Sequence, residues 1–108
     1  MTNKEKIDLL KASPSDDCSK LEYFYTLFEK ADAIKYDYND YMNTKPIDCD
    51  AELARLDDAD YDLCCALMTM LLRETRWVGE RCFERRYENG DVQKITSRII
   101  NILENTDK

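Results

Sequence analysis

The longest apolar run in the chain lies near its middle, from Leu63 to Leu72. On a helix this run is apolar on nearly every side, and a helix of that kind lies in the centre of a domain. Asp57 to Asp60 precede the run, where carboxylates favour the positive end of the helix dipole. Gly79 follows it, and glycine readily adopts the conformation that ends helices. The pattern predicts a central helix, built on residues 59 to 74, that ends near residues 77 to 79.

Apolar residues at intervals of three and four predict an amphipathic C-terminal helix that packs on the central one. These residues are Val92, Ile95, Ile99 and Ile102. Asp91 directly precedes them and is the expected N-cap. A shorter helix before it carries Phe83 and Tyr87 one turn apart and ends at Asn89-Gly90.

The pattern of apolar and capping residues in the N-terminal third predicts two more helices. Residues 3 to 12 form a short one with Ile7 and Leu10 facing inward. Ser13-Pro14 ends this helix and begins the next, because serine caps helices and proline suits their first turn. The second helix runs to about residue 33 on an apolar face formed by Leu21, Phe24, Phe28 and Ala31.

The segment between these helices and the central one is irregular. Residues 36 to 42 mix strand-like and helical spacing, and we expect a short helical turn. Residues 43 to 46, which end in Pro46, form a loop. Asp48 or Asp50 then caps a short helix that continues through Leu53 and Leu56.

These elements predict an all-α fold, a compact bundle of five or six helices in a single domain over residues 1 to 108. Residues 1 to 13 are expected to be a loosely attached N-terminal helix. Only two glycines and two prolines occur, which disfavours folds with many tight turns. The apolar run of ten residues spans about 15 Å of helix, half a bilayer core, so we expect no membrane association. The N-terminus has no apolar signal region, which indicates a cytoplasmic protein.

The residue types present argue against an enzyme. No histidine occurs, so catalytic triads lack their usual proton carrier. Alternating acids at Asp58, Asp60 and Asp62 begin like a calcium loop, but Leu63 and Thr69 replace its glycine and glutamate. The five cysteines show no zinc spacing and are expected to be reduced thiols, with Cys64 and Cys65 in the core. Without a glycine-rich phosphate loop either, we expect no catalytic residue, metal or cofactor.

Charge is divided unevenly along the chain. Residues 1 to 70 carry sixteen acidic and eight basic residues, whereas residues 71 to 108 carry seven and eight, out of a total charge of −7. Six of the seven tyrosines lie in the acidic part. Tyrosines beside carboxylates favour binding to a basic protein surface. The candidate partner-binding residues are Tyr36, Asp37, Tyr38, Asp40 and Tyr41.

An alternative site lies in the C-terminal part, where arginines surround the single tryptophan. Its residues are Arg73, Arg76, Trp77, Arg81 and Arg85. Arginine forks suit phosphate or carboxylate, so this cluster would bind nucleic acid or a small anion. Glutamates at spacings of three and four, including Glu74, Glu80 and Glu84, would instead neutralise these arginines within the helices. Residues 73 to 98 carry a net charge of only +2, so direct nucleic-acid binding is the less favoured interpretation.

Two segments resemble a known family. Leu71-Leu-Arg-Glu-Thr-Arg-Trp77, followed by Phe83-Glu-Arg-Arg-Tyr-Glu-Asn-Gly90, resembles a C-terminal series in an uncharacterised family of small bacterial and phage domains of unknown function. Tyr36-Asp-Tyr38-Asn-Asp-Tyr41 is similar to an aromatic element of the same family. The resemblance covers about residues 34 to 103 and implies a mobile-element setting rather than an activity.

These observations favour a non-enzymatic interaction protein. Charge, size and the implied setting suggest a phage or mobile-element inhibitor of a host defence protein, similar in kind to an anti-CRISPR protein. Its partner would be a nucleic-acid-handling protein with a basic surface. A homodimer formed through amphipathic helix surfaces is a further possibility.

Overall fold

The computed structural model describes residues 2–12, 19–79 and 81–106, and these ranges contain six α-helices and two short 3₁₀ helices. The elements follow one another as α1 (Asn3–Lys11), α2 (Lys20–Lys30), η1 (Tyr38–Tyr41), α3 (Cys49–Leu53), η2 (Leu56–Asp58), α4 (Tyr61–Val78), α5 (Cys82–Glu88) and α6 (Asp91–Thr106). No strand occurs in the described ranges. The predicted all-α fold is confirmed.

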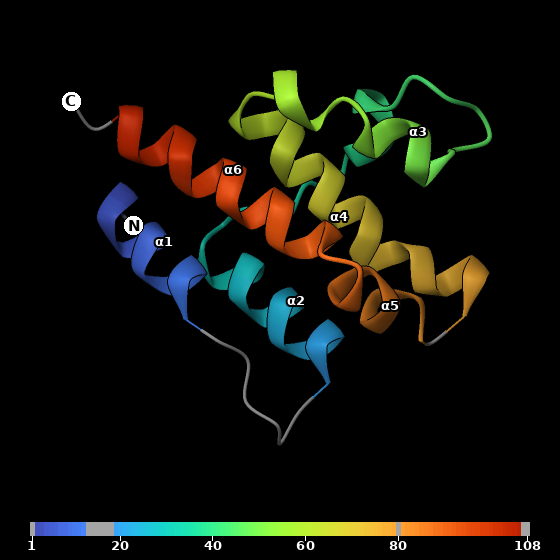
Figure 1. Cartoon of the computed structure of the whole chain (residues 1–108), viewed down its shortest axis with the longest axis horizontal. Helices are drawn as coiled ribbons and strands as arrows, with labels where there is room; N and C mark the ends of the chain where they lie inside the picture. Colours follow the sequence, from blue (N-terminus) through green and yellow to red (C-terminus); the bar gives the residue numbers. More distant parts are fainter. Residues whose placement is uncertain (1, 13–18, 80, 107–108) are drawn as a thin grey trace.

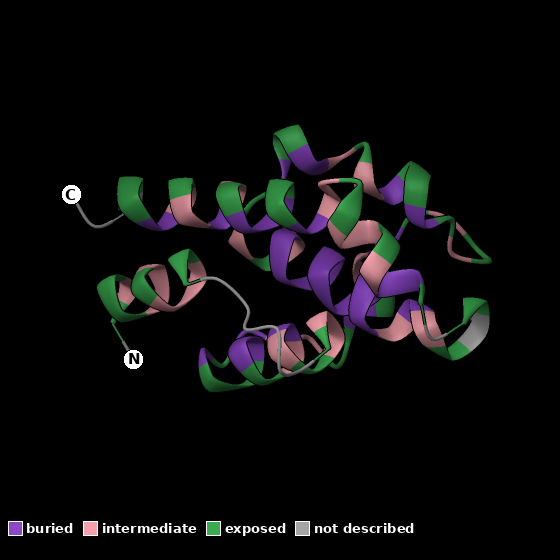
Figure 2. Ribbon diagram, turned by 60° about the horizontal axis from the view of Figure 1, so that its bottom comes forward, coloured by how far each residue is buried: buried purple, intermediate pink, exposed green. Residues whose placement is uncertain are grey.

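Helix α4 is the centre of the molecule, as its sequence predicted. All residues from Cys64 to Leu72 are buried, on every side of the helix (Figure 2). The Oδ1 atom of Asp60 accepts a hydrogen bond of 2.8 Å from the backbone N–H of Leu63 and caps the helix. At the other end Gly79 has a φ of 133°, which a side chain would strain. Cys64 and Cys65 are core residues, as expected.

Every side of α4 is covered by another element. Helices α6, α5, α3 and α2 and the 3₁₀ helix η1 all contact α4, and α6 has the most extensive contact. Helix α6 buries one face, with Ile95 and Ile99 inward, and exposes the other (Figure 2). Helix α1 lies along α6, so the start of α1 and the end of α6 are on the same side of the molecule (Figure 1).

The two N-terminal helices form largely as predicted. Ile7 and Leu10 on α1 are partly buried against the core. The expected start of the next helix at Ser13-Pro14 lies outside the described residues, and the described helix α2 is capped by Ser19, which accepts a hydrogen bond from Glu22 N–H. Helix α2 ends at Lys30 rather than near residue 33, because Asp32 takes a positive φ of 55° and turns the chain.

Helix boundaries around α3 and α6 differ from the predictions. Asp48 caps α3 as expected, but Leu56 belongs to the separate 3₁₀ helix η2. Asp91 was predicted to cap α6 and instead is its first residue. Its carboxylate accepts a hydrogen bond from Arg86 on α5, so a tertiary contact uses the group that would otherwise cap the helix.

The four cysteines that the structure describes, Cys49, Cys64, Cys65 and Cys82, are all buried and unpaired. Cys18 lies outside the described residues. None of the described helices is both long and apolar enough to cross a membrane.

The packing of α6 on α4 predicts a sharp difference between two neighbouring isoleucines. Ile99 is 2 % exposed, whereas Ile100 is only partly buried. Replacing Ile99 with alanine should lower the free energy of unfolding by about 2–4 kcal/mol, because it removes buried apolar surface and leaves a cavity. The same substitution at Ile100 is the matched control and should cost clearly less. Urea denaturation of both variants tests this, and equal losses would contradict the orientation of α6.

Candidate interaction surface

The segment that leads from α2 to η1 is held firmly against α4. The backbone N–H of Lys35 donates a hydrogen bond of 3.0 Å to the Oγ1 atom of Thr69 on α4. The side chain of Lys35 forms a salt bridge of 3.2 Å with Asp62, and this partner raises the pKa of the lysine. Ala33 before it is buried. These contacts fix where the acidic, tyrosine-bearing segment begins.

The 3₁₀ helix η1 then divides its residues between the core and the surface. Tyr38 is only 8 % exposed and Met42 is also buried, whereas Tyr36 is 69 % exposed. Tyr41 is half-buried, and its carbonyl oxygen accepts a hydrogen bond of 2.8 Å from Nη1 of Arg55. The prediction of a short helical turn is confirmed. Tyr38, predicted as a partner-binding residue, is a core residue, because η1 packs on α4 and residues three apart in a 3₁₀ helix, such as Tyr38 and Tyr41, share one side.

Three exposed residues remain from the predicted patch, and with Asn39 they form the η1 face: Tyr36, Asp37, Asn39 and Asp40. Asp37 occupies the N-cap position of η1, but its side chain makes no capping hydrogen bond. Neither Asp37 nor Asp40 takes part in a salt bridge within the described part of the chain. Both carboxylates are therefore available to a partner.

A buried carboxylate that the sequence did not reveal supports this region. Glu52 on α3 is completely buried and accepts hydrogen bonds from the backbone N–H groups of Asn43 and Thr44, at 2.9 and 2.7 Å. It also accepts from the Thr44 hydroxyl and from Arg55 at 2.6 and 2.7 Å. Burial alone would raise the pKa of Glu52, but these hydrogen bonds together outweigh burial and lower it. Glu52 thus ties the loop after η1 to α3.

The predicted basic cluster draws Arg73 and Arg76 from α4 and Arg85 from α5, and Arg73 adjoins the η1 face. The guanidinium of Arg73 lies over the ring of Tyr36, with 5.9 Å between Cζ and the ring centroid. Its Nε atom is the one buried side-chain nitrogen or oxygen in the described residues without a hydrogen-bond partner. Arg76, Arg81 and Arg85 are exposed. The side chain of Trp77 lies outside the described part of the structure.

None of the glutamates that the structure describes forms a salt bridge with these arginines, contrary to what the spacing suggested. Glu84 accepts a hydrogen bond from the backbone N–H of Lys20 at 2.9 Å, and Glu80 lies outside the described residues. Glu74 pairs with Arg86 on α5 instead of with a neighbour on its own helix. The spacing rule considers only one helix, whereas the packing of α5 on α4 brings Arg86 to Glu74.

Arg86 is the centre of a second charge cluster that sequence reasoning missed. Its guanidinium binds Glu74 at 2.8 Å, Asp50 at 2.7 Å and Asp91 at 3.1 Å, and so joins α5 to α4, α3 and α6. The hydrogen bond to Glu74 is the main reason why the pKa of Arg86 is raised. Burial would raise the pKa of Glu74, but the hydrogen bond from Arg86 and others from two thiols lower it.

Those two thiols belong to Cys82 and Cys49, and neither is activated. Burial raises the pKa of Cys49 to about 12 and that of Cys82 to about 11, and the hydrogen bond to Glu74 adds to the effect in both. Burial likewise raises the pKa of Cys64 to about 12 and that of Cys65 to about 11. Because the thiolate is the reactive form, these four thiols are poor nucleophiles.

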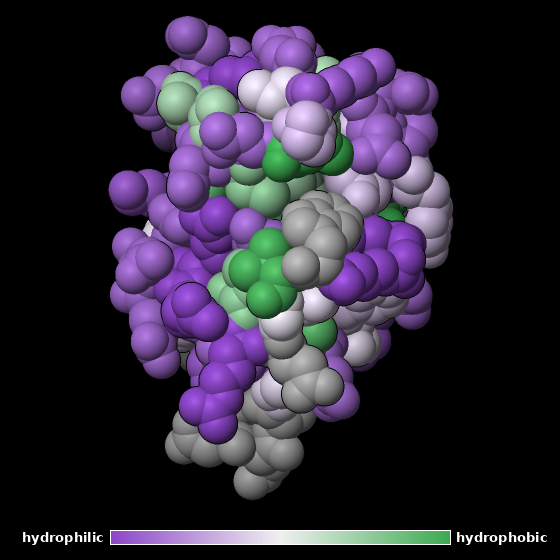
Figure 3. Space-filling model, turned by 90° about the vertical axis from the view of Figure 1, so that its right-hand side faces the viewer, coloured by the Kyte–Doolittle hydropathy of each residue, from purple (hydrophilic) through white to green (hydrophobic). Residues whose placement is uncertain are grey.

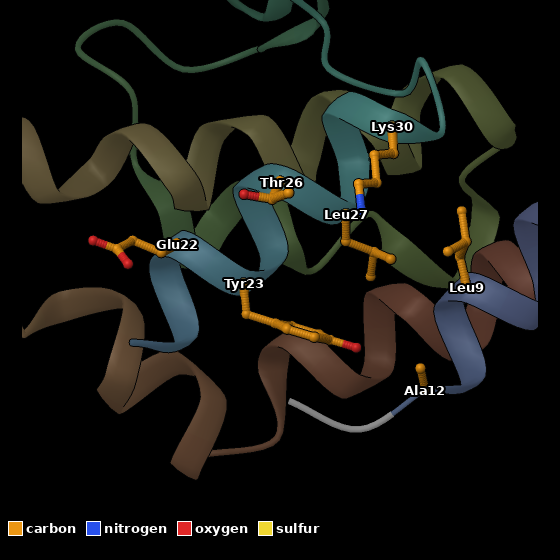
Figure 4. A pocket seen from close by; sticks show the side chains of 7 residues that line it. All are labelled: Leu9, Ala12, Glu22, Tyr23, Thr26, Leu27 and Lys30. Carbon is orange, nitrogen blue, oxygen red and sulfur yellow. The ribbon is translucent and has the colours of Figure 1, made fainter. Parts of the chain in front are cut away.

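Shallow hollows lie on the described part of the surface. One, of about 340 Å³, lies between α1 and α2, where Leu9 faces Tyr23 and Leu27 and where Lys30 lies near the edge (Figure 4). Another, of about 420 Å³, lies between α2 and α4 and is lined by Tyr25, Leu72 and Arg76 among others. No group of three potential metal ligands occurs among the residues described.

Comparison with known proteins identifies a family. The model of a family described as "Family of unknown function (DUF6508)" matches residues 2–105. No curated protein and no solved structure matches the chain.

The buried carboxylate of Glu52 leads to a prediction about pH. Glu52→Gln should lower the free energy of unfolding by about 1–3 kcal/mol at pH 7, because an amide leaves buried donors poorly paired. The carboxylate has a lowered pKa, so its stabilising effect is complete above the ordinary value of 4.5 and is lost as the pH falls through the folded-state value. The difference from the wild type should therefore shrink in acid.

Urea denaturation from pH 7 down to about pH 3 measures this difference on both sides of the ordinary carboxyl pKa. Glu104→Gln, at an exposed position on α6, is the matched control and should change stability little at any pH. A Glu52→Gln variant as stable as the wild type throughout would contradict the role of Glu52.

Proposed function

The chain belongs to this family of unknown function, and from its surface we propose that it is a non-enzymatic interaction protein whose η1 face binds a basic surface on another protein. The binding residues are Tyr36, Asp37 and Asp40, with Tyr41 at the inner edge. The partner class to be tested first is a nucleic-acid-handling defence protein, which a mobile-element inhibitor would target.

The exposure of Tyr36 is the observation that carries this proposal. Large apolar and aromatic side chains are otherwise well covered, and only Tyr36 and Val78 are strongly exposed in the described residues. The view from the side of α3 and the end of α4 shows that hydrophilic residues cover most of that surface (Figure 3). An exposed tyrosine offers a large contact area at a low entropic cost.

The charges around Tyr36 support a basic partner. Asp37 and Asp40 follow Tyr36 in the sequence and form no salt bridge in the described part of the chain. A net charge of −7 would attract a basic surface over a longer range and raise the rate of association. The proposal therefore combines a local aromatic contact with long-range attraction.

The state of the buried titratable groups supports a role without catalysis. Glu52 and Glu74 have lowered pKa values and are held ionised by their partners, so neither is suited to donate or accept a proton near neutral pH. The described thiols have raised pKa values. These groups stabilise the fold instead of supplying a reactive centre.

Reversing the charges of the η1 face should weaken capture of the partner. In affinity capture from host lysates treated with nuclease, Asp37→Arg with Asp40→Arg should reduce the yield of the specific partner at least about tenfold, because buried interface charges typically contribute 2 kcal/mol or more. High salt should reduce capture by the wild type as well.

The matched control reverses Asp57 and Asp58, which are also exposed but lie on η2 against α6. This control changes the net charge by the same amount and should retain capture. If both double variants lost capture equally, the effect would be one of net charge, and the η1 face would not be the site. Capture that is indifferent to salt and to both variants would also overturn the proposal.

A second candidate function is the binding of nucleic acid or a small anion by the arginines. It is favoured by the partnerless Nε of Arg73 and by the exposure of Arg76, Arg81 and Arg85. On this proposal, fluorescence anisotropy at low salt should detect binding of single-stranded oligonucleotides that falls steeply with salt. Arg76→Glu should weaken it, and flat titrations with single-stranded and duplex DNA would remove this candidate.

A further inference from the structure

We propose that the η1 face and the adjoining Arg73 and Arg76 together form a self-complementary surface to which a second copy of the chain docks. In this two-fold dimer, Asp37 and Asp40 of each copy face Arg73 and Arg76 of the other. The exposed acids of one site that the sequence suggested and two arginines of its alternative are then the two halves of one interface.

The structure places the two halves side by side. Tyr36 directly precedes Asp37, and its ring contacts the guanidinium of Arg73. Arg76 is one helical turn further along α4, on the same side as Arg73. The η1 helix itself packs on α4. Arg73 thus lies against the exposed aromatic ring that directly precedes the first acid of the η1 face.

Neither half is neutralised within the chain. Among the described residues, Asp37, Asp40, Arg73 and Arg76 form no salt bridge. The Nε of Arg73 is buried without an acceptor, and a buried N–H of a charged group normally has one. A carboxylate placed against the arginine fork would accept from its terminal nitrogens and compensate its charge.

A two-fold interface requires acidic and basic residues that lie next to each other on one surface. In a symmetric dimer the same patch meets itself after rotation, so a patch that is acidic on one side and basic on the other pairs each sign with its opposite. The rotation axis would pass near Tyr36, which places the two exposed rings at the centre of the interface. Central aromatic residues surrounded by charge pairs are typical of interfaces.

The dimer would also regulate the function proposed above. A basic partner needs Asp37 and Asp40, and the second copy covers the same residues, so the two binding events compete. The dimer does not depend on that function, since it needs only this chain.

The test uses two variants, each of which reverses the charges of one half of the interface. One variant reverses the acids (Asp37→Arg, Asp40→Arg), and the other reverses the arginines (Arg73→Glu, Arg76→Glu). Each variant alone places like charges across the interface and should be monomeric. Mixed in equal amounts, the two variants restore both sets of opposite charges and should form a 1:1 heterodimer.

Sedimentation velocity measures the masses at about 0.1 M and 1 M salt, where the Debye length falls from about 10 to 3 Å. The wild type should dimerise at low salt and dissociate at high salt. Arg81→Glu with Arg85→Glu is the matched control, since it changes the charge equally at the N-cap of α5 and within α5 and should not pair with the acid-reversed variant. Arg76→Glu alone, at an exposed position, replaces the double variant if that variant does not fold.

A wild type that stays monomeric at low salt would overturn the dimer, and so would a mixture of the reversed variants that remains monomeric. If a basic protein is captured by a monomeric wild type, the dimer is excluded while the proposed function stands. If the dimer forms and no partner is captured, the opposite holds.

Discussion

Burial of α4 on all its sides is the constraint on which the rest of the structure depends. From Cys64 to Leu72 this helix offers no face that tolerates water, so other elements must cover its whole circumference. Helices α6, α5, α3 and α2 cover most of it, and the short segment around η1 covers the remainder. That requirement buries Tyr38 and Met42 and leaves Tyr36, Asp37 and Asp40 outside. The candidate surface is therefore a consequence of core packing.

Two buried carboxylates hold the covering elements in place. Glu52 binds the loop after η1 through Asn43 and Thr44, and Glu74 holds Arg86, which joins α5 to three other helices. A buried carboxylate is tolerated only when hydrogen bonds and an opposite charge compensate its loss of water. Both carboxylates meet this condition, and removing either partner would leave a costly unpaired group. The packing around α4 thus depends on polar contacts as well as on apolar ones.

The sequence predicted the parts of the fold that follow from local pattern. Local pattern alone predicts α4 from the apolar run around Leu67 and its end from Gly79. It likewise predicts α6 from the spacing of Val92, Ile95 and Ile99. The predicted end of α2 was about three residues too late, because a positive φ at Asp32 turns the chain. The prediction that Asp91 caps α6 was wrong, because its carboxylate binds Arg86 instead. Local patterns contain no information about such contacts.

The candidate site shows the same division between local and tertiary information. Tyrosines alternating with aspartates indicated an exposed acidic segment, but composition could not tell which ring faces α4. Glu52 looked like any other surface acid on a short helix, and its burial follows only from the path of the loop at residues 43 and 44. The contact between Tyr36 and Arg73, which are 37 positions apart in the chain, likewise required the fold.

The most direct test of this account is the accessibility of Tyr36 and Tyr38 to a paramagnetic agent in solution. With 3-fluorotyrosine incorporated and each signal assigned by a tyrosine-to-phenylalanine variant, ¹⁹F NMR reports the two rings separately. We expect strong broadening of the Tyr36 signal by a soluble gadolinium complex and little effect on the Tyr38 signal. Equal broadening of both signals would show that η1 does not cover α4 and would contradict the origin proposed for the surface.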